Sequence, residues 1–114
     1  MIDTSLKTLS EYDEIKRNYE LVGKWDIIVQ VGRGEKYSNP YEIYRLGNEY
    51  IGVYPEVGSI NKIREIETLR KVDNKLYIVG NKNGEYYMID KNKNMALFDK
   101  YGDLESAGWK AIKR

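Results

Sequence analysis

The sequence predicts an α+β fold, in which one mainly antiparallel sheet ends in a C-terminal three-stranded meander and is flanked by two or three helices. Three apolar and aromatic runs, at residues 76–79, 85–89 and 95–98, are separated by turns rich in Asn, Lys and Gly, which is typical of a meander. Two other segments carry apolar residues at helical spacing. The length of 114 residues predicts a single domain, residues 1–114.

The first predicted element is a helix that begins near residue 8. Thr8 and Glu11 have the spacing of a capping box, in which the two side chains satisfy backbone N–H groups of the first turn. Apolar residues then recur at helical spacing at Tyr12, Ile15, Tyr19 and Val22. Gly23 ends this pattern, so we expect the helix to stop there.

Strands are predicted next. Residues Trp25 to Val31 alternate, so that Ile27, Val29 and Val31 share one face. Residues 32–40 predict a loop, because they begin with two closely spaced glycines and end with Asn-Pro.

A hairpin is predicted around Gly47-Asn48, which tolerates the positive φ of a two-residue turn between strands 41–46 and 50–54. The second strand places Ile51 and Val53 on one face. Its other face carries Tyr50, Gly52 and Tyr54. We expect the aliphatic pair to face the core and the tyrosines to face the outside or a covering element.

Two further helices complete the predicted fold. Ser59 can cap a helix over residues 59–71. Its apolar stripe would consist of Ile60, Ile63, Ile66 and Leu69. Residues 103–112 predict a short final helix, because they begin with acids and end with basic residues, which matches the helix dipole.

Composition disfavours catalysis. The chain has no Cys and no His, which excludes thiolate chemistry, disulfides and imidazole-dependent triads. We therefore expect no enzyme, no cofactor and no metal. The net charge is +1 with both signs interspersed, so the field of a typical nucleic-acid binder is missing. Neither a signal peptide nor an apolar run long enough for a membrane span is visible, and we expect a cytoplasmic protein without membrane contact.

Two motifs could hold chemistry. Asp90, Asn92 and Asn94 copy the opening of a calcium loop, but Met95 and Tyr101 replace the glycine and the last acid, so a hairpin turn is the preferred interpretation. Carboxylates at one end of the meander could also form an acid–base pair across a cleft. These candidates are Asp90, Asp99 and Asp103, and their geometry cannot be derived from the sequence.

Part of the chain resembles the SUKH superfamily of bacterial toxin-immunity proteins. The resemblance covers roughly residues 41–104. It rests on Gly52 to Pro55, a helix-like segment at 59–71, and the meander with Gly84-Glu-Tyr-Tyr-Met-Ile-Asp90. The resemblance implies an α+β fold and one-to-one binding and neutralisation of a cognate toxin, possibly a nuclease.

The resulting hypothesis is an immunity protein, a monomer or weak dimer whose partner is a toxin domain. Tyr-rich strand faces supply rigid anchors for such an interface. The expected contact residues are Tyr37, Tyr50, Tyr54, Glu56, Tyr86, Asp90 and Asp99. The near-neutral charge is a difficulty for this hypothesis, because an acidic patch would suit a basic nuclease better. Five acids could still cluster into such a patch: Glu49, Glu56, Glu85, Asp90 and Asp99.

Two alternatives stay open. One is a nucleic-acid-binding or phage accessory module that uses basic residues beside aromatic ones. Its residues would be Lys24-Trp25, Arg33, Lys36-Tyr37, Trp109-Lys110 and Lys113-Arg114. The other is a small carboxylate-dependent enzyme.

Overall fold

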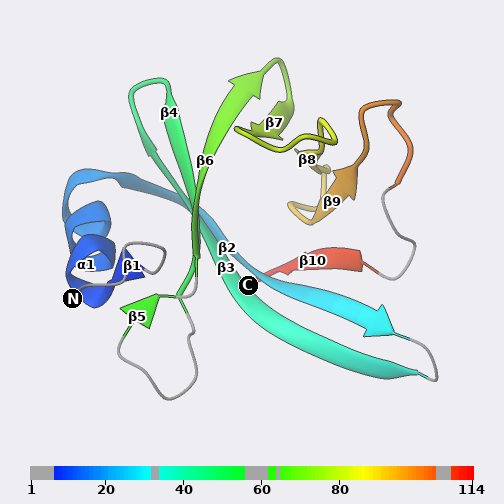
Figure 1. Ribbon diagram of the computed structural model, residues 1–114, viewed down its shortest axis with the longest axis horizontal. Helices are drawn as coiled ribbons and strands as arrows, with labels where there is room; N and C mark the ends of the chain where they lie inside the picture. Colours follow the sequence, from blue (N-terminus) through cyan, green and yellow to red (C-terminus); the bar gives the residue numbers. More distant parts are fainter. Residues whose placement is uncertain (1–6, 32–33, 56–61, 64, 105–108) are drawn as a thin grey trace.

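The computed structural model of the chain describes residues 7–31, 34–55, 62–63, 65–104 and 109–114. Its main feature is a closed antiparallel β-barrel of eight strands, which Figure 1 shows with the helix lying at one side. The prediction of an α+β fold with two or three helices is therefore wrong. In the described ranges the chain forms one helix, and strands predominate.

The barrel has an up-and-down order. Its strands are β2 (Glu20–Val31), β3 (Glu35–Leu46), β4 (Glu49–Tyr54), β6 (Glu65–Val72), β7 (Lys75–Ile78), β8 (Tyr86–Ile89), β9 (Met95–Phe98) and β10 (Trp109–Lys113). Each strand pairs with the next one along the chain, and β10 returns to pair with β2. The remaining elements are α1 (Leu9–Asn18) and a small sheet of β1 (Lys7–Thr8) and β5 (Lys62–Ile63).

Because neighbouring strands alternate in direction, the turns gather at two ends of the barrel. Residues 47–48, 73–74 and 90–94 lie at one end, which we call the mouth end. Residues 79–85 and 99–104 lie at the opposite end. This placement decides which loop residues can act together.

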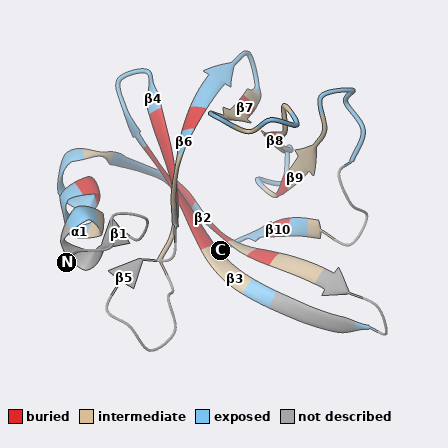
Figure 2. Cartoon of the chain, viewed as in Figure 1, coloured by how far each residue is buried: buried red, intermediate tan, exposed pale blue. Residues whose placement is uncertain are grey.

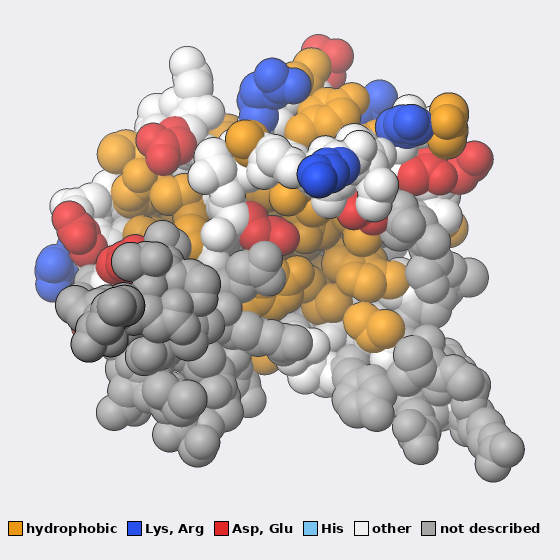
Figure 3. All heavy atoms as spheres, in the orientation of Figure 1, with side chains coloured by type: hydrophobic (Ala, Val, Ile, Leu, Met, Phe, Trp, Pro, Cys, Tyr) orange, Lys and Arg blue, Asp and Glu red, His pale blue; other side chains and the backbone are white. Residues whose placement is uncertain are grey.

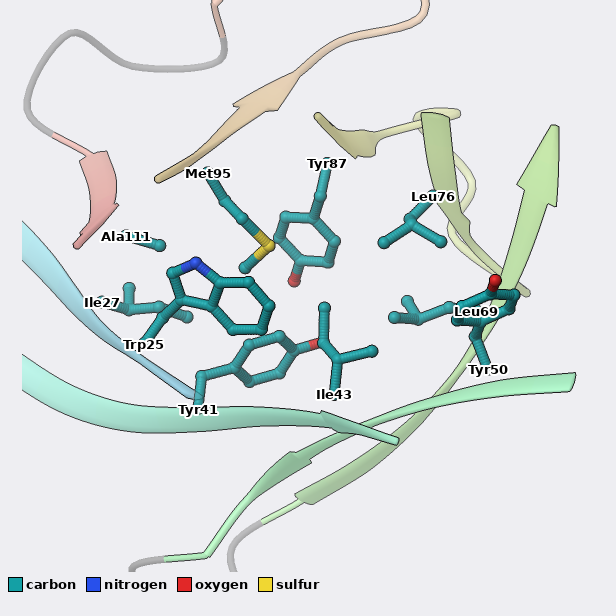
Figure 4. Packing of buried hydrophobic residues seen from close by; sticks show 10 residues of the cluster. All are labelled: Trp25, Ile27, Tyr41, Ile43, Tyr50, Leu69, Leu76, Tyr87, Met95 and Ala111. Carbon is teal, nitrogen blue, oxygen red and sulfur yellow. The ribbon is translucent and has the colours of Figure 1, made fainter. Parts of the chain in front are cut away.

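Aromatic rings fill the barrel. The largest fully buried side chains include Trp25, Tyr41 and Tyr87, which point toward one another in Figure 4. Tyr41 lies across Gly52, where an added Cβ would be 1.8 Å from the phenolic oxygen. Glycine is therefore required at position 52 to leave room for this ring.

The helix covers the outer face of β3 and β4. Ile15 of α1 packs against Tyr44, Ile51 and Val53, and Figure 2 shows buried positions on both α1 and β4. The alternation predicted for residues 50–54 is present, but the barrel lies on the tyrosine side. Ile51 and Val53 point outward and are buried under the helix, so they are shielded from water as core residues are.

Tyr50 and Tyr54 point into the barrel. Tyr50 belongs to the central core cluster, and the ring centroid of Tyr54 lies 4.6 Å from that of Tyr41. Both faces of β4 are thus apolar, and the chemical contrast between the faces could not indicate which one meets the main core.

The predicted helix over residues 59–71 is wrong, because residues 65–72 form strand β6. The three-residue spacing arises because Ile66 faces outward under α1 while Leu69 faces the barrel core. Each side of β6 thus meets an apolar environment, and the strand supplies the second hydrogen-bonding edge that β4 needs. Residues 59–61 and 64 lie outside the described residues.

The predicted final helix is wrong as well. Trp109 and Ala111 of β10 face the barrel, with the Trp109 ring stacked on Tyr87, while Lys110 and Ile112 face outward. The period is therefore two. The first helix is confirmed but ends at Asn18, and most of the predicted loop at 32–40 belongs to β3.

A nine-residue repeat forms β8, β9 and the turns beside these strands. The turn at 81–85 is followed by β8 (residues 86–89), and the turn at 90–94 is followed by β9 (residues 95–98). The turn at 99–103 is followed by Leu104, which forms a bridge with Phe98. The first side chain of each turn accepts hydrogen bonds, 2.8–3.4 Å long, from the backbone N–H groups of the residues two and four positions later in the chain. These first residues are Asn81, Asp90 and Asp99. The fourth residue has positive φ in every copy: Gly84, Lys93 and Gly102.

Candidate binding surface

Two carboxylates inside the structure serve as acceptors for tyrosines. Under α1, buried Glu42 accepts hydrogen bonds from the hydroxyls of Tyr12 and Tyr44. Burial, followed by these hydrogen bonds, raises the pKa of Tyr12 to about 12 and raises the pKa of Tyr44 further. Lys24 approaches Glu42 at 3.8 Å. This cluster is closed by the helix and holds α1 on the barrel.

The second carboxylate lies within the barrel wall. Glu67 Oε2 accepts hydrogen bonds from Tyr41 at 2.8 Å and from Tyr87 at 3.1 Å. Burial is the main cause that raises the pKa of both phenols well above the usual value, so they remain donors at neutral pH. The group is a satisfied polar network between β3, β6 and β8.

A row of aromatic residues lies on the outer face of β6 to β9. Their inward neighbours Leu69, Leu76, Tyr87 and Leu97 belong to or pack against the core. The strand register then places five outward residues side by side across neighbouring strands: Arg70, Tyr77, Tyr86, Phe98 and Leu104. We call this outer face, with Lys75, Val79, Lys100 and Tyr101 at its borders, the bare wall.

Cations lie over the rings of the bare wall. Lys75 Nζ is 5.0 Å from the ring centroid of Tyr86, Arg70 Cζ is 6.0 Å from that of Tyr77, and Lys100 Nζ is 5.2 Å from that of Tyr101. Within the described part of the chain, none of these three cations forms an ion pair. Their charges are therefore available to a partner.

The bare wall also exposes apolar groups and is hollowed in two places. Tyr101, Val79 and Leu104 are 77%, 56% and 55% exposed. One depression of about 270 Å³ is lined by residues that include Arg70 and Tyr77, and another of about 280 Å³ by residues that include Lys100 and Tyr101. In Figure 3 the region over β7 and β8 shows lysine or arginine side chains among hydrophobic ones.

The structure does not bring the predicted contact residues together. Tyr50 and Tyr54 face the barrel interior, and only Tyr86 lies in the aromatic row, where it is 5% exposed. Tyr37 lies in β3, paired with Val29, and its side chain is not described. Glu56 lies outside the described residues.

The predicted acids also separate. Asp90 and Glu49 lie at the mouth end, whereas Asp99 and Glu85 lie at the opposite end. The side chains of Asp90 and Asp99 each accept hydrogen bonds from backbone N–H groups of their own turns. Residues 90–94 form the hairpin turn that the sequence favoured over a calcium loop. Asp90 therefore cannot face Asp99 or Asp103 across one cleft, and the four described acids do not cluster into one patch.

Of the basic–aromatic pairs predicted for nucleic acid, the two that contain tryptophan are not stacking platforms. Arg33 lies outside the described residues, and the side chains of Lys36 and Tyr37 are not described. Trp25 is 1% exposed and donates its indole N–H to the carbonyl of Lys93 at 2.6 Å. Trp109 stacks on Tyr87 inside the barrel. The residues that do combine rings with cations include Tyr77 and Arg70. Because side chains alternate between the two faces of a strand, these outward residues follow from the sequence once the core-facing residues of the strands are known.

A scan against protein-family models and searches of curated proteins and of solved structures found no match to the chain. Among the described residues, no group of three or more acidic side chains is placed to hold a metal ion. None of the helices described is long and apolar enough to cross a membrane.

Proposed function

We propose that this chain is a non-catalytic binding protein that docks on one partner protein through the bare wall, as an immunity protein docks on its toxin. The observation that carries the proposal is the cross-strand row from Arg70 to Leu104, together with Arg70, Lys75 and Lys100, which form no ion pair within the described residues. The fold that the SUKH resemblance implies is wrong for this chain, so the proposal depends on the surface and not on the family.

The composition of the bare wall suits a protein interface. Tyr, Phe and Arg are enriched among residues that dominate binding energy, and rings held by a sheet lose little conformational entropy on binding. Tyr77, Tyr86 and Phe98 are fixed by ring contacts, with centroids 5.1 and 5.6 Å apart. Exposed Tyr101 and Val79 can then bury new apolar area.

The charge of the bare wall indicates the chemistry of the partner. Arg70, Lys75 and Lys100 have free charges in the described structure, whereas Asp99 is engaged by backbone N–H groups. A partner surface with exposed carboxylates around an apolar centre would be complementary. This reverses the polarity expected for the inhibitor of a basic nuclease.

The test is a binding titration against the product of the neighbouring reading frame. Arg70→Glu and Leu104→Ala should each weaken the complex about tenfold or more, which corresponds to about 1.4 kcal/mol. Matched controls lie away from the bare wall: Arg17→Glu, at an exposed position of α1, and Leu46→Ala, whose side chain is 50% exposed against 55% for Leu104. Both controls should leave the affinity within about twofold.

Two outcomes would contradict the proposal. Equal losses from the wall variants and their controls would show that binding does not use this surface. Salt-sensitive binding of a single-stranded oligonucleotide that is abolished by Arg70→Glu would instead favour the nucleic-acid alternative.

A further inference from the structure

Another cavity opens at the mouth end of the barrel, away from the two depressions of the bare wall. Its volume is about 320 Å³, within the lower range of small-molecule sites. It is lined by residues of five strands and their turns: Val22, Tyr50, Lys71, Asp73, Asn74, Leu76, Ile89, Asp90 and Lys93. The fold thus brings together side chains that are as far apart in the sequence as Val22 and Lys93.

The inner part of this mouth cavity is apolar. Leu76 and Tyr50 are buried members of the barrel core, and Ile89 packs against the same core. Val22 forms another apolar side and is 40% exposed. An apolar group of a ligand that entered the cavity would therefore lose contact with water against aliphatic and aromatic surface.

The rim of the mouth cavity carries two charges of each sign. Lys71 and Lys93 contribute ammonium groups, and Asp73 and Asp90 contribute carboxylates. In the described structure no ion pair forms among these four side chains or between them and other residues. Asp90 already accepts hydrogen bonds from the backbone N–H groups of Asn92 and Asn94, so Asp73 is the carboxylate that the described structure leaves for a ligand. A rim with free charge of both signs is complementary to a ligand that carries both signs.

We propose that the mouth cavity binds a small zwitterion with an apolar body, the chemical class of the apolar α-amino acids. The apolar body lies against Leu76 and Ile89, the carboxylate of the ligand pairs with Lys71, and the ammonium group pairs with Asp73. Phenylalanine is a suitable probe because its ring and zwitterionic head match these two regions.

The experiment is an NMR titration of the full chain with phenylalanine, 2-phenylethylamine and 3-phenylpropionate. Phenylalanine should produce saturable shifts at Leu76 and Ile89, with a Kd of about a millimolar for so small a ligand. The amine and the acid each lack one charge and should bind at least about fivefold more weakly. Non-saturating shifts, or shifts spread over the surface, would overturn the proposal.

Two rim variants and a control test the assignment of charges. Lys71→Gln should weaken phenylalanine and 3-phenylpropionate but not 2-phenylethylamine, and Asp73→Asn should weaken phenylalanine and the amine but not the acid. Lys110→Gln, outside the cavity, should change none of the three affinities. Equal binding of the three probes, or equal effects of the variants on all of them, would contradict the zwitterion site.

Discussion

The two sides of the barrel use the same inward packing but finish their outer faces differently. On the side of β3 and β4, aliphatic residues and the Glu42 cluster lie under α1. On the side of β7 to β9, rings and cations face outward, and the helix lies across the barrel from them (Figure 1). The first side is completed by the chain itself, so the second is the better candidate for a partner.

The largest expected effect is at Gly52, on the helix-covered side. Gly52→Ala places a methyl group 1.8 Å from the Tyr41 hydroxyl and 2.5 Å from its ring carbon, so the ring must leave its place beside Glu67. We expect a loss of roughly 3 kcal/mol or more in the free energy of unfolding, measured by urea denaturation.

A double-mutant cycle checks that Tyr41 is the cause. In a Tyr41→Leu background the added methyl group meets a shorter side chain, so Gly52→Ala should cost much less than in the parent protein. Additive losses would show that the alanine acts through the backbone of β4 and not through this ring.

The next effect compares the two sides directly. Ile15 is 8% exposed beneath α1, and Ile15→Ala should cost roughly 2–4 kcal/mol, because it leaves a cavity against Ile51 and Val53. Val79→Ala at the border of the bare wall should cost less than about 0.5 kcal/mol, because Val79 is 56% exposed. Similar losses in thermal or urea unfolding would mean that the bare wall is also a structural face.

The strands of the meander were predictable, but the closure of the barrel was not. The apolar runs at 76–79, 85–89 and 95–98 are separated by turn residues, and the structure places β7, β8 and β9 at these runs. Closure depends on the pairing of β10 with β2, a contact between chain ends that no local pattern encodes. The acidic start and basic end of residues 103–112 favoured a helix, whereas burial of Trp109 and Ala111 favours the strand.

The contact residues of the candidate surface were predicted wrongly for a related reason. A strand pattern tells which residues share a face, but not which face meets the core when both are apolar. For β4 this reversed the orientation of Tyr50 and Tyr54. For β6, apolar residues on opposite faces imitated a helical stripe, with Ile66 under α1 and Leu69 in the barrel. Arg70 lies within the range of the predicted helix, so the sequence did not place it beside Tyr77.

Alkaline pH should weaken the helix-covered side progressively. The phenol of Tyr12 has an ordinary pKa of 10.0 when unfolded and a pKa of about 12 beside Glu42 when folded. The unfolded chain therefore releases this proton first, so the contribution to stability is complete below pH 10 and is lost as the pH rises to about 12. Urea unfolding across this range measures the slope.

The matched variants separate this phenol from other alkaline effects. Tyr12→Phe should be less stable at neutral pH but should show a shallower fall above pH 10, because it has no proton to release. Tyr101→Phe, at a ring that is 77% exposed, should keep the slope of the parent protein. An unchanged slope in Tyr12→Phe would show that the Tyr12 phenol does not cause the loss of stability above pH 10.

The smallest effect concerns the repeated turns that support the bare wall. Lys93 has φ of 70° where the other two copies have Gly84 and Gly102. A side chain in this left-handed region costs roughly 1–2 kcal/mol, and glycine loses about 0.4–1 kcal/mol through the entropy of the unfolded chain. Lys93→Gly should therefore stabilise the protein by about 0.5 kcal/mol, measured as an increase in the urea midpoint.

Two controls decide whether this gain belongs to the turn conformation. Lys91→Gly, at a position of the same turn without positive φ, should be destabilising, because glycine there brings only its entropy cost. Gly102→Lys should be destabilising as well, since it places a side chain at φ of 87°. Opposite signs for Lys93→Gly and Gly102→Lys would establish that the three turns obey one backbone rule, whereas equal signs would show that each is shaped by its own surroundings.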